Sequence, residues 1–278
     1  MALYARPSRI EDALAALAGG DRVVVAGGTD HYPARVGKPL DEPVLDITGL
    51  TALRGITETA DAWRIGALAT WTDLIEARLP AWFDGFKLAA REVGGVQIQN
   101  AGTIVGNLCN ASPAADGIPN LLALDATVEL ACADATRALP VAAFVQGNRK
   151  TARDPRELVT ALVIPKPRQA AHATFLKLGA RRYLVISIVM VAAVLETTPD
   201  RRVAAARVAV GACSAVACRL PALEAALAGR ALDASLADHV TPEHLAPLAP
   251  IDDVRGTAAY RRDAAVTLVR RALAGLAA

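Results

Sequence analysis

The stretch that decides the fold is VVVAGGTD, residues 23–30. Its first part is a continuous run of β-branched residues, which is typical of a strand buried on both faces. Its second part is a glycine turn, which leaves backbone N–H groups free to meet an anion and lets a ligand approach the main chain closely. The stretch therefore predicts a phosphate or pyrophosphate cradle. It lacks the spacing of the Rossmann and P-loop fingerprints, and an ordinary strand-to-helix turn is the alternative.

The residues on either side of this stretch predict a small α/β unit. Ser8 and Glu11 have capping-box spacing ahead of an alanine-rich helix that ends at Gly19-Gly20. A second strand is expected at residues 44–47. Helix, strand, glycine turn and strand together suggest a first unit that ends near residue 55.

A second unit is predicted to begin with a strand at residues 63–65, followed by a helix that Thr70 or Thr72 caps. A further strand ends at Pro165, and IPKPRQA, residues 164–170, is the best linker candidate. After it, strand-rich segments precede two alanine-rich helices, one around LPALEAALAGR and one near the C-terminus.

The segment QIQNAGTIVGNLCNASPAAD, residues 97–116, is rich in Gly, Asn, Ser and Thr. It shows neither helical nor strand periodicity, so it predicts a functional loop. Thr103 and Asn107 offer side-chain donors, and Asp116 could accept a hydrogen bond from a ribose hydroxyl. A capped turn is the alternative, but a second glycine loop in the same chain makes that explanation weaker for both.

Charge and cysteine content exclude several classes of function. The net charge is +2, with 30 basic and 28 acidic residues mixed along the chain, so no stripe for nucleic acid or polybasic membrane anchor is expected. The double-arginine steps, such as Arg261-Arg262, are interpreted as solvated faces. The four cysteines form no C-x-x-C pair, so we expect no metal site and no iron–sulfur cluster on this chain.

The longest apolar stretch, YLVISIVMVAAVLE, residues 183–196, is too short to span a membrane. We expect it to form a buried strand or helix. The N-terminus lacks the apolar core of a signal peptide, and a cytoplasmic protein is therefore expected.

Six segments occur together in an order and at spacings that are specific to one family. They are AGGTD, VLDITGLTALRGI, WRIGALATWTDL, QIQNAGTIVGNLCNASPAAD, ELVTALVIP and FLKLGARRYLVIS. On these segments the chain resembles the FAD-binding medium subunit of molybdenum hydroxylases, the family of xanthine dehydrogenase and aerobic carbon monoxide dehydrogenase. The resemblance implies an α+β protein with the FAD-binding PCMH-type fold. Two α/β subdomains, residues 1–55 and 56–167, would precede a C-terminal α+β domain of antiparallel sheet plus helices, residues 168–278.

The resemblance also implies one non-covalently bound FAD and no catalytic residue on this chain. The two glycine loops would enclose the FAD pyrophosphate, Asp116 would lie at the ribose, and Val159 and Lys177 near the isoalloxazine, where a cation favours the reduced flavin. Without the resemblance, Lys177 would be interpreted as a snorkelling surface lysine. The implied binding residues are Val24, Val25, Ala26, Gly27, Gly28, Thr29, Asp30, His31, Gly102, Thr103, Ile104, Val105, Gly106, Asn107, Asp116, Val159 and Lys177.

The implied function is electron transfer in an oxidoreductase complex, a dimer of heterotrimers. The molybdenum cofactor would sit on a large molybdopterin-binding subunit and [2Fe-2S] clusters on a small subunit, and electrons would pass through the FAD to an external acceptor. Val93 and Val105 depart from the family pattern. Residues 181–186 lack the acidic pair of animal xanthine dehydrogenases, which weakens the argument for an NAD site on this chain. The alternatives are a free-standing FAD oxidoreductase of the same fold superfamily and an assembly scaffold without FAD.

Overall fold

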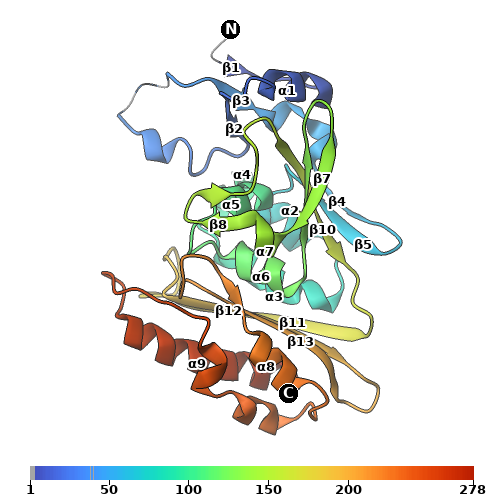
Figure 1. Ribbon diagram of the computed structural model, residues 1–278, viewed down its shortest axis with the longest axis vertical. Coiled ribbons are helices and arrows are strands. Elements are labelled where there is room, and N and C mark those ends of the chain that lie inside the picture. Colours follow the sequence, from blue (N-terminus) through green and yellow to red (C-terminus); the bar gives the residue numbers. More distant parts are fainter. Residues whose placement is uncertain (1–3, 38, 40) are drawn as a thin grey trace.

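Three stacked β-sheets organise the molecule, which the computed structural model describes over residues 4–37, 39 and 41–278 (Figure 1). The N-terminal sheet lies at one end, a five-stranded sheet with its helices forms the middle, and a four-stranded sheet with two helices forms the other end. Within the described residues no helix is both long and apolar enough to traverse a lipid bilayer.

The N-terminal sheet is parallel, with strand order β1-β3-β2. Since β2 lies at its edge, only Val25 of that strand is fully buried, and the predicted burial on both faces is wrong. The predicted capping box is also wrong: α1 has Arg9 as its N-cap, and the carboxylate of Glu11 accepts from the Arg9 Nε at 3.3 Å instead. The elements are β1 Tyr4–Ala5, α1 Ile10–Leu17, β2 Val23–Val25 and β3 Val44–Asp46.

The middle sheet is antiparallel throughout, in the order β4-β5-β10-β6-β7. The strands expected at residues 63–65 and before Pro165 are confirmed as β5 and β10, and they pair with each other. The second subdomain therefore mixes helices with an antiparallel rather than a parallel sheet. Its strands are β4 Ile56–Glu58, β5 Ala62–Gly66, β6 Thr127–Ala131, β7 Thr136–Pro140 and β10 Leu158–Pro165.

The segment predicted as a loop, residues 97–116, is mostly helical, so that prediction is wrong. Two helices of six and seven residues occupy it, α4 and α5. Helices this short gain little from intrinsic propensity and depend on tertiary packing, which the sequence pattern does not reveal. The helices and the ribbon of this part are α2 Trp71–Glu76, α3 Asp84–Glu92, α4 Val96–Ala101, α5 Ile104–Asn110, α6 Gly117–Ala123, α7 Val141–Phe144, β8 Val145–Gly147 and β9 Lys150–Thr151.

Thr70, rather than Thr72, caps α2. Its hydroxyl accepts from the Asp73 N–H at 3.1 Å while the Asp73 carboxylate accepts from the Thr70 N–H at 2.8 Å, which completes a capping box. We expect Thr70→Ala to lower the free energy of unfolding by about 1 kcal/mol, because a cap is lost. Thr72→Ala, which leaves the box intact, is the matched control in urea unfolding. Equal losses in the two variants would contradict this assignment.

The C-terminal sheet separates two apolar cores, and β12 contributes to both. Met190, Ala192 and Val194 face the core shared with the other two sheets. Val191 and Leu195 face a second core formed with α8 and α9. This strand confirms a buried strand, one of the two forms expected for the apolar stretch at residues 183–196, from Val189 onward. The expectation is wrong for the beginning of the stretch, where Tyr183, Leu184 and Ile186 are exposed. The elements are β11 Ala170–Leu178, β12 Val189–Thr197, β13 Val203–Gly211, β14 Cys218–Arg219, α8 Pro221–Leu227 and α9 Ala258–Ala277.

Helix α6 lies on the C-terminal sheet, and arginines of that sheet bind its C-terminal end. The Arg207 Nε donates to the Ala123 carbonyl at 2.9 Å, and the Arg219 Nη1 donates to the Leu122 carbonyl at 3.0 Å. Arg219 also pairs with Asp125, just beyond the helix, at 2.7 Å. Helix carbonyls that have no partner within the helix are satisfied here by cations, which also complement the helix dipole.

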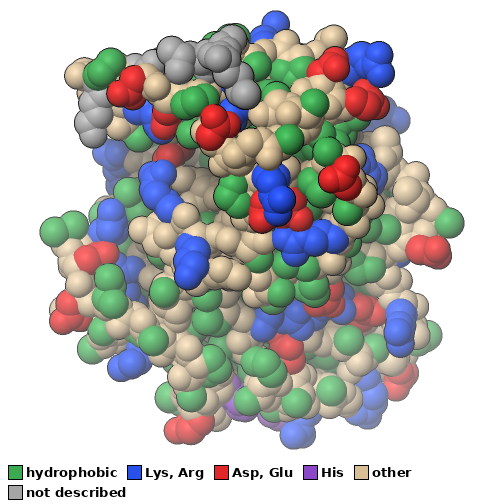
Figure 2. Space-filling model, turned by 45° about the horizontal axis from the view of Figure 1, so that its top comes forward, with side chains coloured by type: hydrophobic (Ala, Val, Ile, Leu, Met, Phe, Trp, Pro, Cys, Tyr) green, Lys and Arg blue, Asp and Glu red, His purple; other side chains and the backbone are tan. Residues whose placement is uncertain are grey.

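Arg261 in α9 is buried, so the interpretation of every double-arginine step as a solvated face is wrong at this position. It is 3% exposed and donates to the carbonyls of Ile188 and Ala212, both at 2.9 Å, and to Asp253. Elsewhere charges are dispersed: the face in Figure 2 shows basic and acidic side chains interspersed, without a stripe of one sign.

Candidate cofactor site

The first glycine loop, residues 26–31, leaves the end of β2 and packs against the junction of α4 and α5. A Cβ on Gly27 would lie 1.8 Å from the Ala101 carbonyl oxygen, so only glycine fits there. Gly28 has φ +68°, a left-handed conformation that favours glycine. The chain then enters a 3₁₀ turn, Pro33–Arg35, and no α-helix follows the loop. Any affinity for an anion therefore depends on the loop itself.

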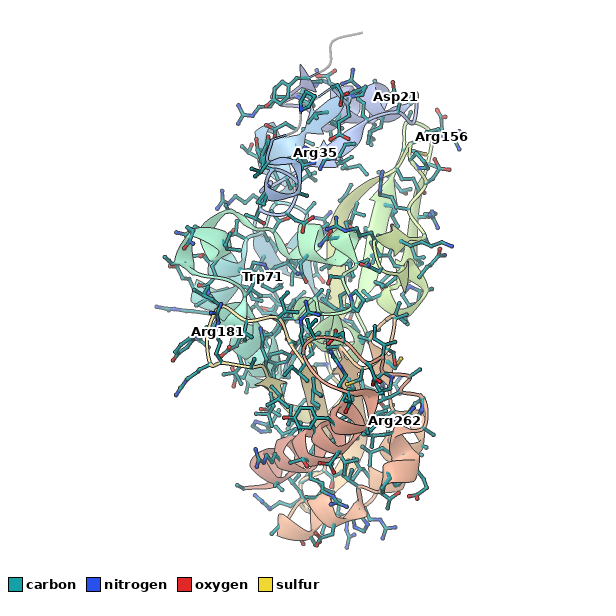
Figure 3. All side chains as sticks on the ribbon, turned by 90° about the vertical axis from the view of Figure 1, so that its left-hand side faces the viewer. Asp21, Arg35, Trp71, Arg156, Arg181 and Arg262 are labelled. Carbon is teal, nitrogen blue, oxygen red and sulfur yellow. The ribbon has the colours of Figure 1, made fainter. Side chains whose placement is uncertain are left out.

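The second glycine loop, residues 102–107, contains the start of α5. Thr103 is the N-cap, and its hydroxyl accepts from the Gly106 N–H at 2.9 Å. The loop is fixed to the start of α2, because the Trp71 N–H donates to the Gly102 carbonyl at 3.2 Å. Trp71 itself lies in the interior of the middle part of the molecule (Figure 3).

The two glycine loops are neighbours in space, as the sequence hypothesis requires. Gly27 abuts Ala101, and the Thr29 Oγ1 lies 3.3 Å from the position that a Cβ on Gly102 would take. Asn107 Oδ1 is buried and has no hydrogen-bond partner among the described residues. A buried acceptor without a donor is costly. This oxygen lies beside the start of α6, because a Cβ on Gly117 would be 2.9 Å from it, and a cofactor donor would give it a partner.

Asp30 and His31, the last two residues of the first glycine loop, contact other segments of the chain. Asp30 pairs with Arg149 of the β8–β9 ribbon at 3.0 Å. The His31 ring packs edge-on against Tyr32 and lies 3.8 Å from a carboxylate oxygen of Glu42. Burial lowers the pKa of His31, and the neighbouring Arg35 lowers it further. The packing of the ring against Tyr32 and its small exposure fit the expected positioning role.

A buried ion pair lies where the C-terminal sheet meets α6. Lys177 on β11 donates to Asp116 Oδ2 at 2.8 Å, and their side chains are 6% and 9% exposed. Ser187 donates to Asp116 Oδ1 at 2.7 Å. Burial raises the pKa of Asp116, and Lys177 and Ser187 oppose that rise. The interpretation of Lys177 as a snorkelling surface lysine is therefore wrong.

Lys177 also lines a cavity of about 420 Å³ beside this pair. Leu88 and Glu92 of α3 form one wall, and Arg181 and Arg182 of the β11–β12 segment form another. Arg181 extends outward at the level where the middle and C-terminal parts meet (Figure 3). The Lys177 ammonium thus lies between a protein carboxylate and an open cavity.

The remaining predicted residues lie in packed elements. Val24 and Val25 are in β2, and Ile104 and Val105 are in the first turn of α5. Val159 is 3% exposed within β10, where it pairs with Leu130. Its place at the cofactor stays a prediction.

Sequence reasoning missed Ser187 as a site residue. Its signal was present: a single serine within the apolar run YLVISIVMV. A buried hydroxyl requires a partner, and that partner is a carboxylate 71 positions earlier in the chain.

These features together fit a dinucleotide. The chain approaches itself so closely at Gly27 that no side chain fits, the conformation of Gly28 suits glycine, and Asn107 offers an unpaired acceptor. Residues 1–167 match the model of the FAD binding domain in molybdopterin dehydrogenase, and residues 174–276 match the CO dehydrogenase flavoprotein C-terminal domain.

The chain belongs to this family of molybdenum hydroxylase flavoproteins. The family, the FAD cofactor and the oxidoreductase class expected from the sequence are confirmed. The expected fold class is confirmed as well, with the antiparallel sheet and helices of the C-terminal domain.

Named relatives support the same assignment. The carbon monoxide dehydrogenase medium chain of Afipia carboxidovorans is 32% identical over 97% of this chain and 94% of that protein. The nicotinate dehydrogenase FAD-subunit of Eubacterium barkeri is 35% identical, over 60% of this chain and 58% of that protein. A solved structure, reconstituted CO dehydrogenase from Oligotropha carboxidovorans, superposes with a TM-score of 0.90 at 29% identity, covering 99% of this chain and 96% of that one.

Proposed function

We propose that this chain binds one FAD non-covalently and transfers electrons within a molybdenum hydroxylase complex. The observation that carries the proposal is the contact of the first glycine loop, at Gly27, with Ala101 and with Gly102 of the second glycine loop, in a chain of this family. FAD, when bound, supplies an acceptor that takes two electrons and can release them singly. This chain supplies binding, orientation and charge.

The proposed roles follow from the position of each group. Gly27 and Gly28 let the first loop pack closely against Ala101 and Tyr32. Backbone N–H groups of that loop hold the pyrophosphate, and Asn107 Oδ1 accepts from a cofactor donor. Lys177, held by Asp116, sets the charge beside the flavin ring. Ala26, Thr29, Ile104, Val105 and Val159 complete the walls of the site.

We propose partners of two kinds: a large molybdopterin-binding subunit, where substrate is hydroxylated, and a small iron–sulfur subunit that delivers electrons to this FAD. Support comes from relatives named as a medium chain and an FAD-subunit, both of which are parts of larger assemblies. For the assembly we propose a cytoplasmic dimer of heterotrimers. For this chain we propose a division into three domains, residues 1–55, 56–167 and 168–278.

An absorption spectrum of the purified chain, before and after denaturation and with added FAD, tests the function. We expect a flavin spectrum and release of FAD rather than FMN. If the chain takes up no flavin under any condition, the result would favour the alternative of an assembly scaffold without FAD. Substrate turnover by the isolated chain would favour a free-standing oxidoreductase.

The same titration tests the site through Asn107→Ala. Because Asn107 Oδ1 is buried and has no partner among the described residues, its loss should not destabilise the FAD-free protein. Loss of a hydrogen bond to the cofactor should weaken FAD binding about tenfold. Asn110→Ala, a half-buried asparagine of the same helix, is the matched control. Equal FAD affinity in both variants would remove Asn107 from the site.

A further inference from the structure

Ser187 is a buried polar residue that the cofactor contacts proposed above do not include. It lies at the end of the segment that joins β11 to β12 and is 1% exposed. Its hydroxyl donates to Asp116 Oδ1 at 2.7 Å. Hydrogen bonds to a carboxylate are among the stronger ones in proteins, so this contact does more than satisfy a buried serine.

The two oxygens of Asp116 are divided between two partners. Oδ1 accepts from Ser187, and Oδ2 accepts from the Lys177 ammonium at 2.8 Å. The Asn120 amide donates to the Asp116 backbone carbonyl, so it fixes the main chain rather than the carboxylate. Ser187 therefore fixes the orientation of the carboxylate toward Lys177.

The charged groups around this pair come from three elements. Lys177 on β11 faces Asp116 directly and also approaches the Glu92 carbonyl of α3 at 3.5 Å. The side chains of Glu92, Arg181 and Arg182 line the cavity beside Lys177. None of these cavity-lining charges is bonded to Asp116 among the described residues, so Lys177 and Ser187 are its side-chain partners.

The position of Ser187 is itself fixed by the C-terminal helix. The next residue, Ile188, donates its N–H to the Leu178 carbonyl at 2.8 Å. The Ile188 carbonyl accepts from Arg261 of α9 at 2.9 Å. Hydrogen bonds at both the N–H and the carbonyl of Ile188 thus fix the backbone next to Ser187 and hold its hydroxyl at Asp116.

We propose that Ser187 is a positioning residue of the cofactor site, which keeps Asp116 ionised and oriented as the partner of Lys177 and so sets the reduction potential of bound FAD. The inference rests on the proposed FAD site. Without the hydroxyl, the carboxylate loses a hydrogen bond that favours its ionised form, so the pKa of Asp116 rises further. Once Asp116 is protonated, the Lys177 charge is no longer balanced, and the reduced flavin is favoured.

The test is the reduction potential of FAD in the flavin-loaded full-length chain, measured from acid to neutral pH. Reduction of the flavin itself takes up protons, so the potential of every variant rises as pH falls. In wild type, protonation of Asp116 should add a further rise at the acid end, above the curve of Asp116→Asn. In Ser187→Ala this additional rise should begin at higher pH. At pH values where Asp116 is protonated in Ser187→Ala but ionised in wild type, the preference for reduced over oxidised FAD should be about tenfold larger in the variant. That ratio corresponds to about 30 mV for a two-electron couple.

Three further variants make the result specific. Ser187→Thr keeps the hydroxyl and should follow the wild-type curve, and Asp116→Asn should show only the rise that proton uptake by the flavin causes. Ser214→Ala removes another hydrogen-bonded serine hydroxyl of the C-terminal domain and should leave the curve unchanged. Coincident curves for wild type and Ser187→Ala, or for wild type and Asp116→Asn, would overturn the inference. Absence of FAD from the wild-type chain would instead refute the proposed function.

Discussion

Gly27→Ala is expected to abolish tight FAD binding and to destabilise the fold. The added Cβ would lie 1.8 Å from the carbonyl oxygen and 2.6 Å from the carbonyl carbon of Ala101. Both are backbone atoms, so no side-chain rotation relieves the clash, and the first glycine loop must separate from the α4–α5 junction. Overpacking of this kind costs about 1–3 kcal/mol, occasionally more. FAD titration and urea unfolding of the variant measure both effects.

The control for Gly27→Ala is Gly275→Ala in α9. A Cβ at Gly275 meets nothing within 4 Å. Alanine is preferred to glycine in a helix by about 1 kcal/mol, so this variant should bind FAD normally and be equally or more stable. Wild-type FAD affinity in Gly27→Ala would show that the contact between the two loops is not needed for the site.

Removing one member of the Lys177–Asp116 pair is expected to produce the largest loss of stability. Lys177→Met leaves a carboxylate that is 9% exposed without its cation, and Asp116→Leu leaves a buried ammonium alone. Breaking a buried pair on one side costs about 3–5 kcal/mol, whereas replacing both members with apolar groups is often neutral. The double variant should therefore recover most of the loss in a double-mutant cycle.

The loss in Lys177→Met should depend on pH. Burial raises the pKa of Asp116, and without Lys177 the folded state binds its proton more readily than the unfolded chain does. Stability then falls as pH rises, so the deficit should be smallest in acid. The control is Lys166→Met, which breaks an exposed pair with Glu58 and should cost at most about 1 kcal/mol. Additive losses in the double variant would contradict direct coupling.

Features that depend on neighbouring residues were predictable from the sequence. The apolar runs predicted β2, β5, β10 and β12, and the glycine turns predicted the two loops that meet. One local prediction was wrong because two side chains compete: Glu11 pairs with Arg9, two positions away, instead of capping. The polar segment was wrongly predicted because of distant contacts: α5 buries Ile104, Val105 and Leu108 in the core, and the α4–α5 junction packs against Gly27.

The centre of the candidate site was the least predictable part. Asp116 meets Lys177 and Ser187 across 61 and 71 positions of chain, and no local pattern encodes a contact at that separation. Lys177 entered the prediction only through family resemblance. Burial of the pair follows from the sheet of one domain covering the helix of another, which periodicity along a single segment cannot show.

Helix α6 has a consequence for hybrids of this chain with its relatives. In chain order it belongs to the segment matched by the FAD-binding model, yet both its ends are bonded by residues of the segment matched by the C-terminal model. A recombinant joined at residues 166–169 would keep Asp116 and Asp125 but import foreign residues in place of Lys177 and Arg219. Such an exchange is expected to succeed only when the incoming C-terminal half carries basic residues at positions 177 and 219. We therefore expect the two halves of the chain to change together among relatives.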